Sequence, residues 1–292
     1  MKKLLIFEIN NVLISRLLKL KFLGHEDFST GGVYGFIQKF TSVVAQHKPS
    51  HILFCDDSPP YERLKYYKEY KQDRSVLQNS SNKEFYLEKT FKEAYRDNKF
   101  ALEEILHALG FDIWKIKGLE ADDLIASCVL EEFNNFDEID IVVKDSDLFP
   151  FLLLPNVFLI RDCVKFGIEE YKRAYNYLKL EDWEFCNALA GTHNNVKGID
   201  RVGLKTAAKF LEHCRANNLD VIEELKLKGW YDTYALNSKL LSLPFTLYNG
   251  TINKAPLKQF KLDIRKLTVF LSIYGIQYSS QMEEAFEYCR FY

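Results

Sequence analysis

Short apolar runs that end at an acidic residue recur along this chain. The three clearest are Leu4–Phe7 before Glu8, His51–Cys55 before Asp56, and Ile139–Val143 shortly before Asp145. Runs of this length and composition are typical of buried β-strands. Helical patterns separate them, which predicts an α/β fold with a mostly parallel central sheet flanked by helices. Ligands of such sheets gather at the carboxyl ends of the strands, where these acids fall.

The spacing of apolar residues between the runs predicts three helices. Gly35–His47 is amphipathic, a helix opens at Ala121 and runs to about Glu132, and a longer helical segment covers 84–109. Acidic residues in the first turn of the second helix also suit the helix dipole. The chain after about residue 180 is mostly helical in pattern, with a short β segment expected around Phe245–Thr251.

Basic residues and tyrosines alternate just after Pro59-Pro60, where the two prolines break the chain. The stretch Tyr61–Arg74 reads YERLKYYKEYKQDR. Single-stranded nucleic acids are bound in this way, with cations on the phosphates and rings on the bases. For Tyr61, Tyr66 and Tyr67, however, packing within the segment is the favoured interpretation.

The most informative motif is GLEADD at Gly118–Asp123, in which three carboxylates occupy four residues. Asp145 and Asp147 form a second acidic pair at the end of a later predicted strand. Clustered carboxylates repel one another and are costly to bury unless a cation lies between them. Mg²⁺ is the simplest such cation because it prefers oxygen ligands. The sequence therefore predicts a metal site, and such sites often hydrolyse phosphodiesters.

Charge is unevenly distributed over the 292 residues. The net charge is only −2, but residues 120–147 carry ten Asp or Glu and one Lys, so basic residues are in excess elsewhere. An acidic pocket beside basic surfaces suits a metal enzyme that handles a polyanion. The six Cys show no CxxC spacing, and no run reaches the length of a membrane span. We therefore expect a cytoplasmic monomer without membrane contact, from a bacterium or a phage-infected cell.

Five motifs in order along the chain resemble those of the 5′-nuclease superfamily: flap endonucleases, bacteriophage 5′–3′ exonucleases and the 5′-nuclease domain of bacterial DNA polymerase. The resemblance runs from Leu4 to about Leu211. The motifs are TGGVYGF at 30–36, YKQDR at 70–74, GLEADD at 118–123, KDSDLFPFL at 144–152 and GIDRVGLKTA at 198–207.

The resemblance implies two domains. Residues 1–180 would form a PIN-like nuclease domain, with a helical arch at about 60–110. Residues 181–292 would form a helical C-terminal domain, with a DNA-binding helix-hairpin-helix at about 185–215.

The resemblance also implies two Mg²⁺ or Mn²⁺ ions held by the acidic residues, with Asp122 central to catalysis. Glu8 stands where the family has its first acid. The first ion would be held by Asp56, Glu120, Asp122 and Asp145, and Asp123 and Asp147 would lean toward the second. For Asp57, which follows Asp56, a loop position is the favoured interpretation.

By the same resemblance, Lys71 and Arg74 would contact the scissile phosphate, and Tyr70 would stack on an unpaired base. An Arg fork can grip two phosphate oxygens, whereas Lys adds a point charge. The hairpin would hold duplex DNA by its backbone, and the family often binds K⁺ there. Its contact residues would be Gly198, Val202, Gly203, Lys205 and Thr206.

Two positions depart from the family pattern. The first acid is Glu8 in place of Asp, which moves the carboxylate by about 1.5 Å, and Mg²⁺ geometry tolerates such a shift poorly. Thr192 and Asn194 stand where G-D-x-x-D-N has its two aspartates, and His193 between them suits Mn²⁺ better than Mg²⁺. We therefore expect one firm metal site and a weakened second one.

The leading hypothesis is a metal-dependent 5′-nuclease that acts on 5′-ended or branched DNA, with RNA–DNA primers left open as substrates. Such an enzyme would work in DNA replication or repair beside replication proteins. The alternative is a catalytically weakened, structure-specific DNA-binding protein on the same fold, which the departures at Glu8, Thr192 and Asn194 favour. A PIN-type ribonuclease would explain the acids but neither the arch nor the hairpin.

Overall fold

A six-stranded sheet forms the centre of the computed structural model, which describes residues 1–20, 24–25, 28–71, 82–192, 196–248, 250, 255–261, 263–276 and 282. The strand order is β5-β4-β1-β6-β7-β8, and every pair except β7–β8 is parallel. The strands are β1 Lys3–Glu8, β4 His51–Cys55, β5 Ile113–Trp114, β6 Glu138–Val142, β7 Val157–Arg161 and β8 Val164–Phe166. This is the parallel, helix-flanked sheet that the apolar runs predicted.

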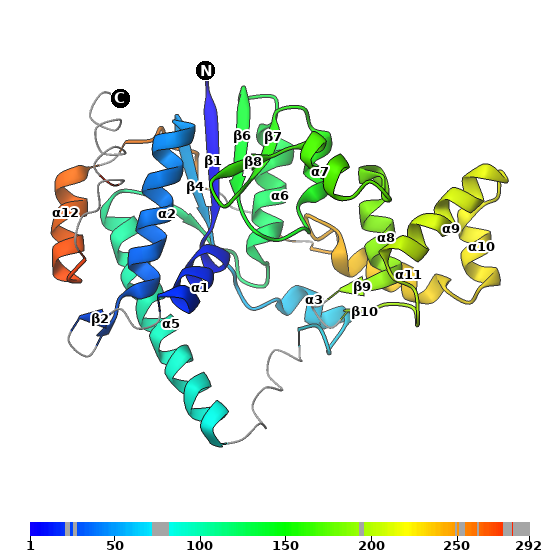
Figure 1. The fold of residues 1–292 in the computed structure, drawn as a ribbon, viewed down its shortest axis with the longest axis horizontal. Coiled ribbons are helices and arrows are strands. Elements are labelled where there is room, and N and C mark those ends of the chain that lie inside the picture. Colours follow the sequence, from blue (N-terminus) through cyan, green and yellow to red (C-terminus); the bar gives the residue numbers. More distant parts are fainter. Residues whose placement is uncertain are drawn as a thin grey trace.

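Helices cover both faces of the sheet (Figure 1). On one face lie α1 Ile9–Lys19, α2 Gly31–His47 and α5 Asn82–Ala108, with α12 Ile264–Ile273 packed against α5. On the other face lie α6 Ala121–Glu132, the 3₁₀ helix η2 Phe149–Leu153 and α7 Ile168–Ala174. The predicted helices at 35–47, 84–109 and 121–132 are confirmed.

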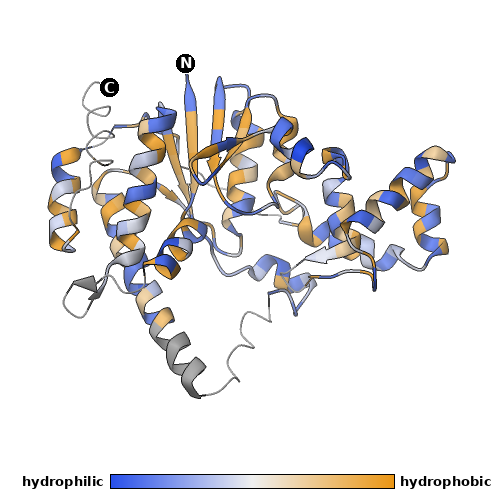
Figure 2. Cartoon of the chain, in the orientation of Figure 1, coloured by the Kyte–Doolittle hydropathy of each residue, from blue (hydrophilic) through white to orange (hydrophobic). Residues whose placement is uncertain are grey.

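Alternation along β1 divides the interior into two cores. Leu5 and Phe7 point into the core beneath α1, α2 and α5, whereas Leu4 and Ile6 point into the core beneath α6. Phe7 stacks on Phe54 with ring centroids 5.4 Å apart. Figure 2 shows these strands as apolar along most of their length, as expected for a sheet buried on both faces.

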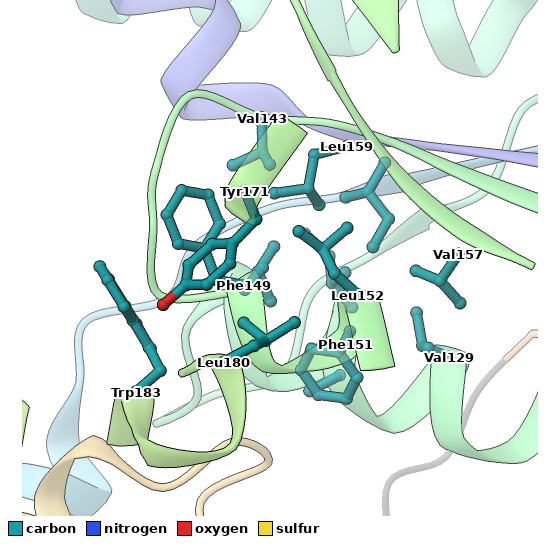
Figure 3. Close-up of a cluster of buried hydrophobic side chains, with 14 of the residues drawn as sticks. Val129, Val143, Phe149, Phe151, Leu152, Val157, Leu159, Tyr171, Leu180 and Trp183 are labelled. Atoms are coloured by element: carbon teal, nitrogen blue, oxygen red, sulfur yellow. The ribbon is translucent and has the colours of Figure 1, made fainter. Parts of the chain in front are cut away.

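An aromatic cluster joins the second core to the C-terminal helices (Figure 3). Phe149 lies against Trp183 at 4.9 Å and against Tyr171 at 5.4 Å between ring centroids. From Trp183 the chain continues through helices that share this core. They are η3 Leu180–Asp182, α8 Trp183–Ala190, α9 Leu204–Ala216, α10 Val221–Leu227 and α11 Tyr231–Leu241.

Two glycines allow the backbone to approach itself closely between α8 and α9. They lie at the ends of a short antiparallel pair, β9 Gly191–Thr192 and β10 Val196–Lys197. A Cβ on Gly198 would lie 2.1 Å from the carbonyl oxygen of Ala190, and Gly191 adopts a φ of 74°. Glycine is therefore required at both positions.

The remaining described elements are short. Helix α3 Tyr61–Tyr66 follows the two prolines, and β2 Gly24–His25 pairs with β3 Phe28–Ser29. Residues 245–248 form no strand, so the β segment predicted at 245–251 is wrong over that part, and residues 249 and 251 lie outside the described ones. No helix in the described ranges is both long and apolar enough to traverse a bilayer.

The C-terminal stretch returns to the sheet. Gln259 bridges to His51, and Phe260 and Leu267 enter the core beneath α2 and α5. We still propose two domains. In this division residues 181–248 form the helical unit, and the residues that follow pack back on the nuclease domain.

Candidate metal centre

Four acidic side chains meet at the carboxyl end of the sheet. Glu8 ends β1, Asp57 follows β4, Asp122 lies in the first turn of α6, and Asp145 follows β6. They line one cavity of about 420 Å³, together with Lys71, Lys144 and the α1 side chains Asn10, Asn11, Ile14, Ser15 and Leu18. The parallel strands thus bring together residues that lie up to 137 positions apart (145 − 8).

Asp122, Asp145 and Asp147 form the tightest group. Each offers a carboxylate oxygen within 4.8 Å of the oxygens of the other two. Asp145 Oδ1 accepts hydrogen bonds from the backbone N–H of Ser146, at 2.6 Å, and of Asp147, at 3.2 Å, which fixes its direction. The group could hold a cation through three oxygens.

Two of the acids that line this cavity have an oxygen without a hydrogen-bond partner. Glu8 Oε2 and Asp122 Oδ1 are inaccessible to solvent and accept no hydrogen bond from any described residue. Burial raises the pKa of Glu8 well above its usual range, and the charges of Asp122, Asp57 and Asp145 raise it further. The pKa of Asp122 is raised by burial, then by Asp145 and Asp147.

The pKa of Asp147 is raised in the same way, into the neutral range. Burial and then the charge of Asp145 raise its pKa to about 7, whereas Lys71 opposes the shift. Mutual repulsion of this kind is relieved when a cation binds among the carboxylates. Orphaned oxygens, raised pKa values and an oxygen-only donor set all fit a hard divalent cation.

Asp56 and Asp57 exchange the positions that the sequence indicated. Asp56 is fully buried and pairs with Lys99 at 2.5 Å and Lys115 at 2.6 Å, away from the cavity. The reason is the alternation of side chains along an extended chain. Phe54 points to the α5 side of the sheet, and Asp56, two residues later, points to the same side. Cys55 points to the α6 side, and so does Asp57. Asp57, expected to be a loop acid, therefore lines the cavity in place of Asp56, with Oδ2 accepting from Asn10 and Oδ1 from the backbone N–H of Ala121, both at 2.8 Å.

Asp123 is also held by the protein itself. Its carboxylate receives a bidentate pair from Arg63, at 2.6 and 2.8 Å, and caps the start of α6 by accepting the N–H of Glu120. Neither Arg63 nor Asp123 is more than 2% exposed. The predicted leaning of Asp123 toward a second metal is not what the structure shows, because its oxygens are already occupied.

Glu120, predicted to hold the first ion, is outside the Asp122–Asp145–Asp147 group of the described residues, but, in addition to burial, its charge raises the pKa of Asp122 and Asp147. It accepts hydrogen bonds from Tyr70 Oη, at 2.8 Å, and from Lys71 Nζ, and Arg63 lies 3.2 Å away. Tyr70 is only 5% exposed, and burial followed by the charge of Glu120 raises its pKa. Its ring is therefore not presented to a nucleic-acid base in this structure, which corrects the predicted stacking role.

A polar network missed by sequence reasoning supports the other side of the cavity. Asn10 Nδ2 donates to Asp57 at 2.8 Å, while Asn10 Oδ1 accepts from Tyr95 and Lys99 of α5, at 2.6 and 2.7 Å. Lys99 in turn holds Asp56. The pairing of Lys99 with Asp56, 43 positions apart, cannot be predicted from local sequence pattern. The four-residue spacing of Tyr95 and Lys99 does indicate that they share one face of a helix.

The hairpin segment is compact. Ile199 N–H donates to Leu189 at 2.8 Å, Val202 N–H donates to Ile199 at 3.0 Å, and Gly203 begins α9 with Lys205 and Thr206 exposed in its first turn. Thr192 is part of β9. Arg74, His193 and Asn194 lie outside the described residues.

A larger cavity, of about 830 Å³, lies between the β4–β5 edge and residues 256–265. Its two acids are occupied, since Asp112 pairs with Lys258 at 2.7 Å and Asp263 caps α12. It therefore offers no carboxylate group comparable to the one at the strand ends.

Comparison with known proteins agrees with this architecture. Residues 13–180 match the family model described as the 5′-3′ exonuclease, N-terminal resolvase-like domain. A DNA polymerase I of Caldicellulosiruptor bescii is 26% identical over 259 residues, which is 82% of this chain and 29% of the polymerase. A 5′-3′ exonuclease of Buchnera aphidicola is 24% identical over 218 residues, which is 71% of this chain and 70% of that protein.

Solved structures share the fold at lower identity. The 5′-exonuclease of bacteriophage T5 with bound zinc superposes with a TM-score of 0.69 at 20% identity, covering 84% of this chain and 91% of that one. A T5 flap endonuclease complex with DNA and metal ions gives 0.67 at 18% identity, covering 99% of this chain and all of that one. The family match spans more than half of the chain, and the chain belongs to the 5′-3′ exonuclease family.

Proposed function

We propose that this protein is a metal-dependent 5′-nuclease, a 5′–3′ exonuclease or flap endonuclease that hydrolyses phosphodiesters in 5′-ended or branched DNA. The observation that carries the proposal is the group Asp122, Asp145 and Asp147, with orphaned oxygens on Asp122 and Glu8 beside it. The chain spans 29% of the C. bescii polymerase and 70% of the Buchnera exonuclease.

A divalent cation held by Asp122, Asp145, Asp147 and Glu8 would lower the pKa of its water and neutralise charge on the phosphate. Lys71 lies at the wall of the same cavity, where its ammonium can donate to a phosphate oxygen. Tyr70 fixes Glu120 from the far side through its hydroxyl. The positive φ of Lys71, 56°, turns the chain at this point.

DNA is the proposed substrate, with RNA–DNA primers as a second one. Structures of the T5 enzyme and of the Rad2 catalytic core are complexes with DNA, and both share this fold. On this chain, the turn at Gly198–Gly203 and the start of α9 would hold the duplex through Lys205, Thr206 and backbone N–H groups, with K⁺ bound in the turn. Such contacts position DNA without reading its sequence.

Mg²⁺ or Mn²⁺ is the proposed cofactor, with one firm site and a weakened second one. Asp122, Asp145 and Asp147 supply the firm site. Thr192 and Asn194 remove two charges from the second, so substrate phosphate or Mn²⁺ would be needed to fill it. Two equally tight Mg²⁺ sites in the free protein, measured by calorimetry, would contradict this part of the proposal.

Cleavage of a 5′-labelled flap DNA with Mg²⁺, and separately with Mn²⁺, tests the proposal. Asp122→Asn is the loss-of-function variant, and Asp232→Asn on the exposed face of α11 is the matched control. Cleavage near the junction that is lost only in Asp122→Asn supports a 5′-nuclease. Salt-sensitive binding of the flap without cleavage would instead indicate a DNA-binding protein on this fold, and cleavage of single-stranded RNA alone would indicate a ribonuclease.

A further inference from the structure

Arg63 joins three parts of the molecule that are distant in sequence. It lies in α3, at the root of the predicted arch, and its side chain is only 2% exposed. Nε donates to the carbonyl of Leu240 at 2.9 Å, and Nη2 to that of Ser242 at 3.3 Å. The other donors grip Asp123. Helix α3, the start of α6 and the chain after α11 are therefore held by one guanidinium.

The same group reaches the edge of the metal centre. Arg63 Nη1 lies 3.2 Å from Glu120 Oε2, the oxygen that also accepts from Tyr70. Asp123 Oδ1 accepts the backbone N–H of Phe245 at 2.9 Å, and the guanidinium carbon lies 4.6 Å from the Phe245 ring centroid. The Leu240–Phe245 segment therefore contacts both members of the pair that flanks Glu120.

Only an arginine satisfies this geometry. Burial disfavours a charge here, but the hydrogen bonds and the charge of Asp123 more than compensate and raise the pKa of Arg63. A planar fork can serve a carboxylate and two carbonyls at once, whereas a lysine has a single nitrogen. Arg63 and Tyr70 both hold Oε2 of Glu120, and Lys71 holds Oε1, so the contacts leave Glu120 one preferred orientation.

We infer that Arg63 is a positioning residue that couples the C-terminal helices to the metal centre through Glu120. The inference rests on the proposed function only for its kinetic readout. The contacts form a contiguous network from Leu240–Phe245 through Arg63 to Glu120, and such networks carry coupling between two sites when the linking element has two arrangements. Duplex bound on α8–α11 would thereby favour the arrangement of Glu120 that supports cleavage.

Hydrogen exchange of the unmodified protein, with and without Mn²⁺, tests the link without any substrate. Mn²⁺ is expected to slow exchange in the peptide that covers Leu240–Phe245, in the native chain and in Arg215→Lys, but not in Arg63→Lys. Arg215 is the matched control because it makes a similar bidentate pair with Asp182, at 2.6 and 2.5 Å, between α9 and η3. Equal protection in Arg63→Lys, or none in the native chain, would overturn the inference.

A double-mutant cycle supplies the kinetic test. Arg63→Lys and Glu120→Gln should each lower kcat by about tenfold or more with KM changed less than about threefold, and the double variant should be no slower than Glu120→Gln alone. Multiplying effects would show that Arg63 acts by another route and would overturn the inference. Absence of cleavage by the native chain would count against the proposed nuclease, and the exchange result would still decide the coupling.

Discussion

The acids at the strand ends fall into two sets with opposite surroundings. Asp56 and Asp123 are fully buried and neutralised by protein cations, Lys99 and Lys115 for the first and Arg63 for the second. Glu8, Asp122, Asp145 and Asp147 instead face one another. The first set is complete within the protein and serves stability. The second set needs an external cation, because its charges otherwise repel.

The largest expected effect comes from breaking the second set. Asp122→Asn should reduce cleavage by at least about a thousandfold, because it replaces the central carboxylate ligand by a neutral amide. The same change should raise the stability of the metal-free protein, because it removes one repelling charge. Flap cleavage and thermal melting in EDTA measure the two outcomes. A metal-free variant that is clearly less stable would show that Asp122 belongs with the structural acids.

Breaking the first set should instead lower the stability of the fold. Asp123→Asn leaves the buried Arg63 without its carboxylate, which should cost about 3–5 kcal/mol of unfolding free energy. Asp182→Asn is the comparison, because its partner Arg215 is 48% exposed and solvent screens the pair. Urea unfolding of both variants measures the difference. Equal losses would mean that burial does not distinguish the two pairs.

The pH dependence should separate the two sets without mutation. The raised pKa values of Glu8, Asp122 and Asp147, the last about 7, mean that the folded metal-free chain holds protons that the unfolded chain releases near pH 4. The unfolding free energy should therefore fall as the pH rises from about 4 to about 7. Mg²⁺ should reverse the trend, since it binds the ionised acids. Urea titrations across this range, with EDTA or Mg²⁺, measure both slopes.

The smallest expected effect concerns the neighbouring acids Asp56 and Asp57. Asp57→Asn should weaken Mn²⁺ binding by about threefold to tenfold, with a smaller loss of metal-free stability than Asp56→Asn, because the amide oxygen can still accept the Ala121 N–H. Asp56→Asn should instead lower the unfolding free energy, because it leaves the mostly buried ammonium of Lys99 without its carboxylate partner. The metal affinity should be nearly unchanged. Calorimetry and urea unfolding of the two variants give a direct comparison. The reverse pattern would restore Asp56 as the ligand that the sequence indicated.

Sequence patterns predicted the elements well but not the division of the acids. The helix at 121–132 matches α6 residue for residue, and the strand at 51–55 matches β4, because each has a clear start and period. Whether Asp56 or Asp57 faces the cavity depends on the pleat at the end of β4. It also depends on Lys99, a tertiary partner that no local pattern reveals.

The candidate site divides in the same way. Asp122, Asp145 and Asp147 were identified by motif and are brought together by the sheet. Arg63 was read only as part of a basic and aromatic stretch, because its partners Leu240 and Ser242 are backbone carbonyls with no signature in the sequence. Motifs therefore predict which acids come together at the strand ends. Tertiary contacts decide which of these acids are neutralised by cations of the protein.

The position of β1 in the middle of the sheet also bears on how the chain reaches its fold. Its first partner is β4, but Lys3 pairs with Glu138 on the other side, 135 residues later (138 − 3). At ribosomal rates this delay is on the order of ten seconds. During that time one edge of β1 lacks its partner strand and presents unpaired backbone N–H and C=O groups, so the nascent N-terminal half is the stage at which chaperones would be most needed.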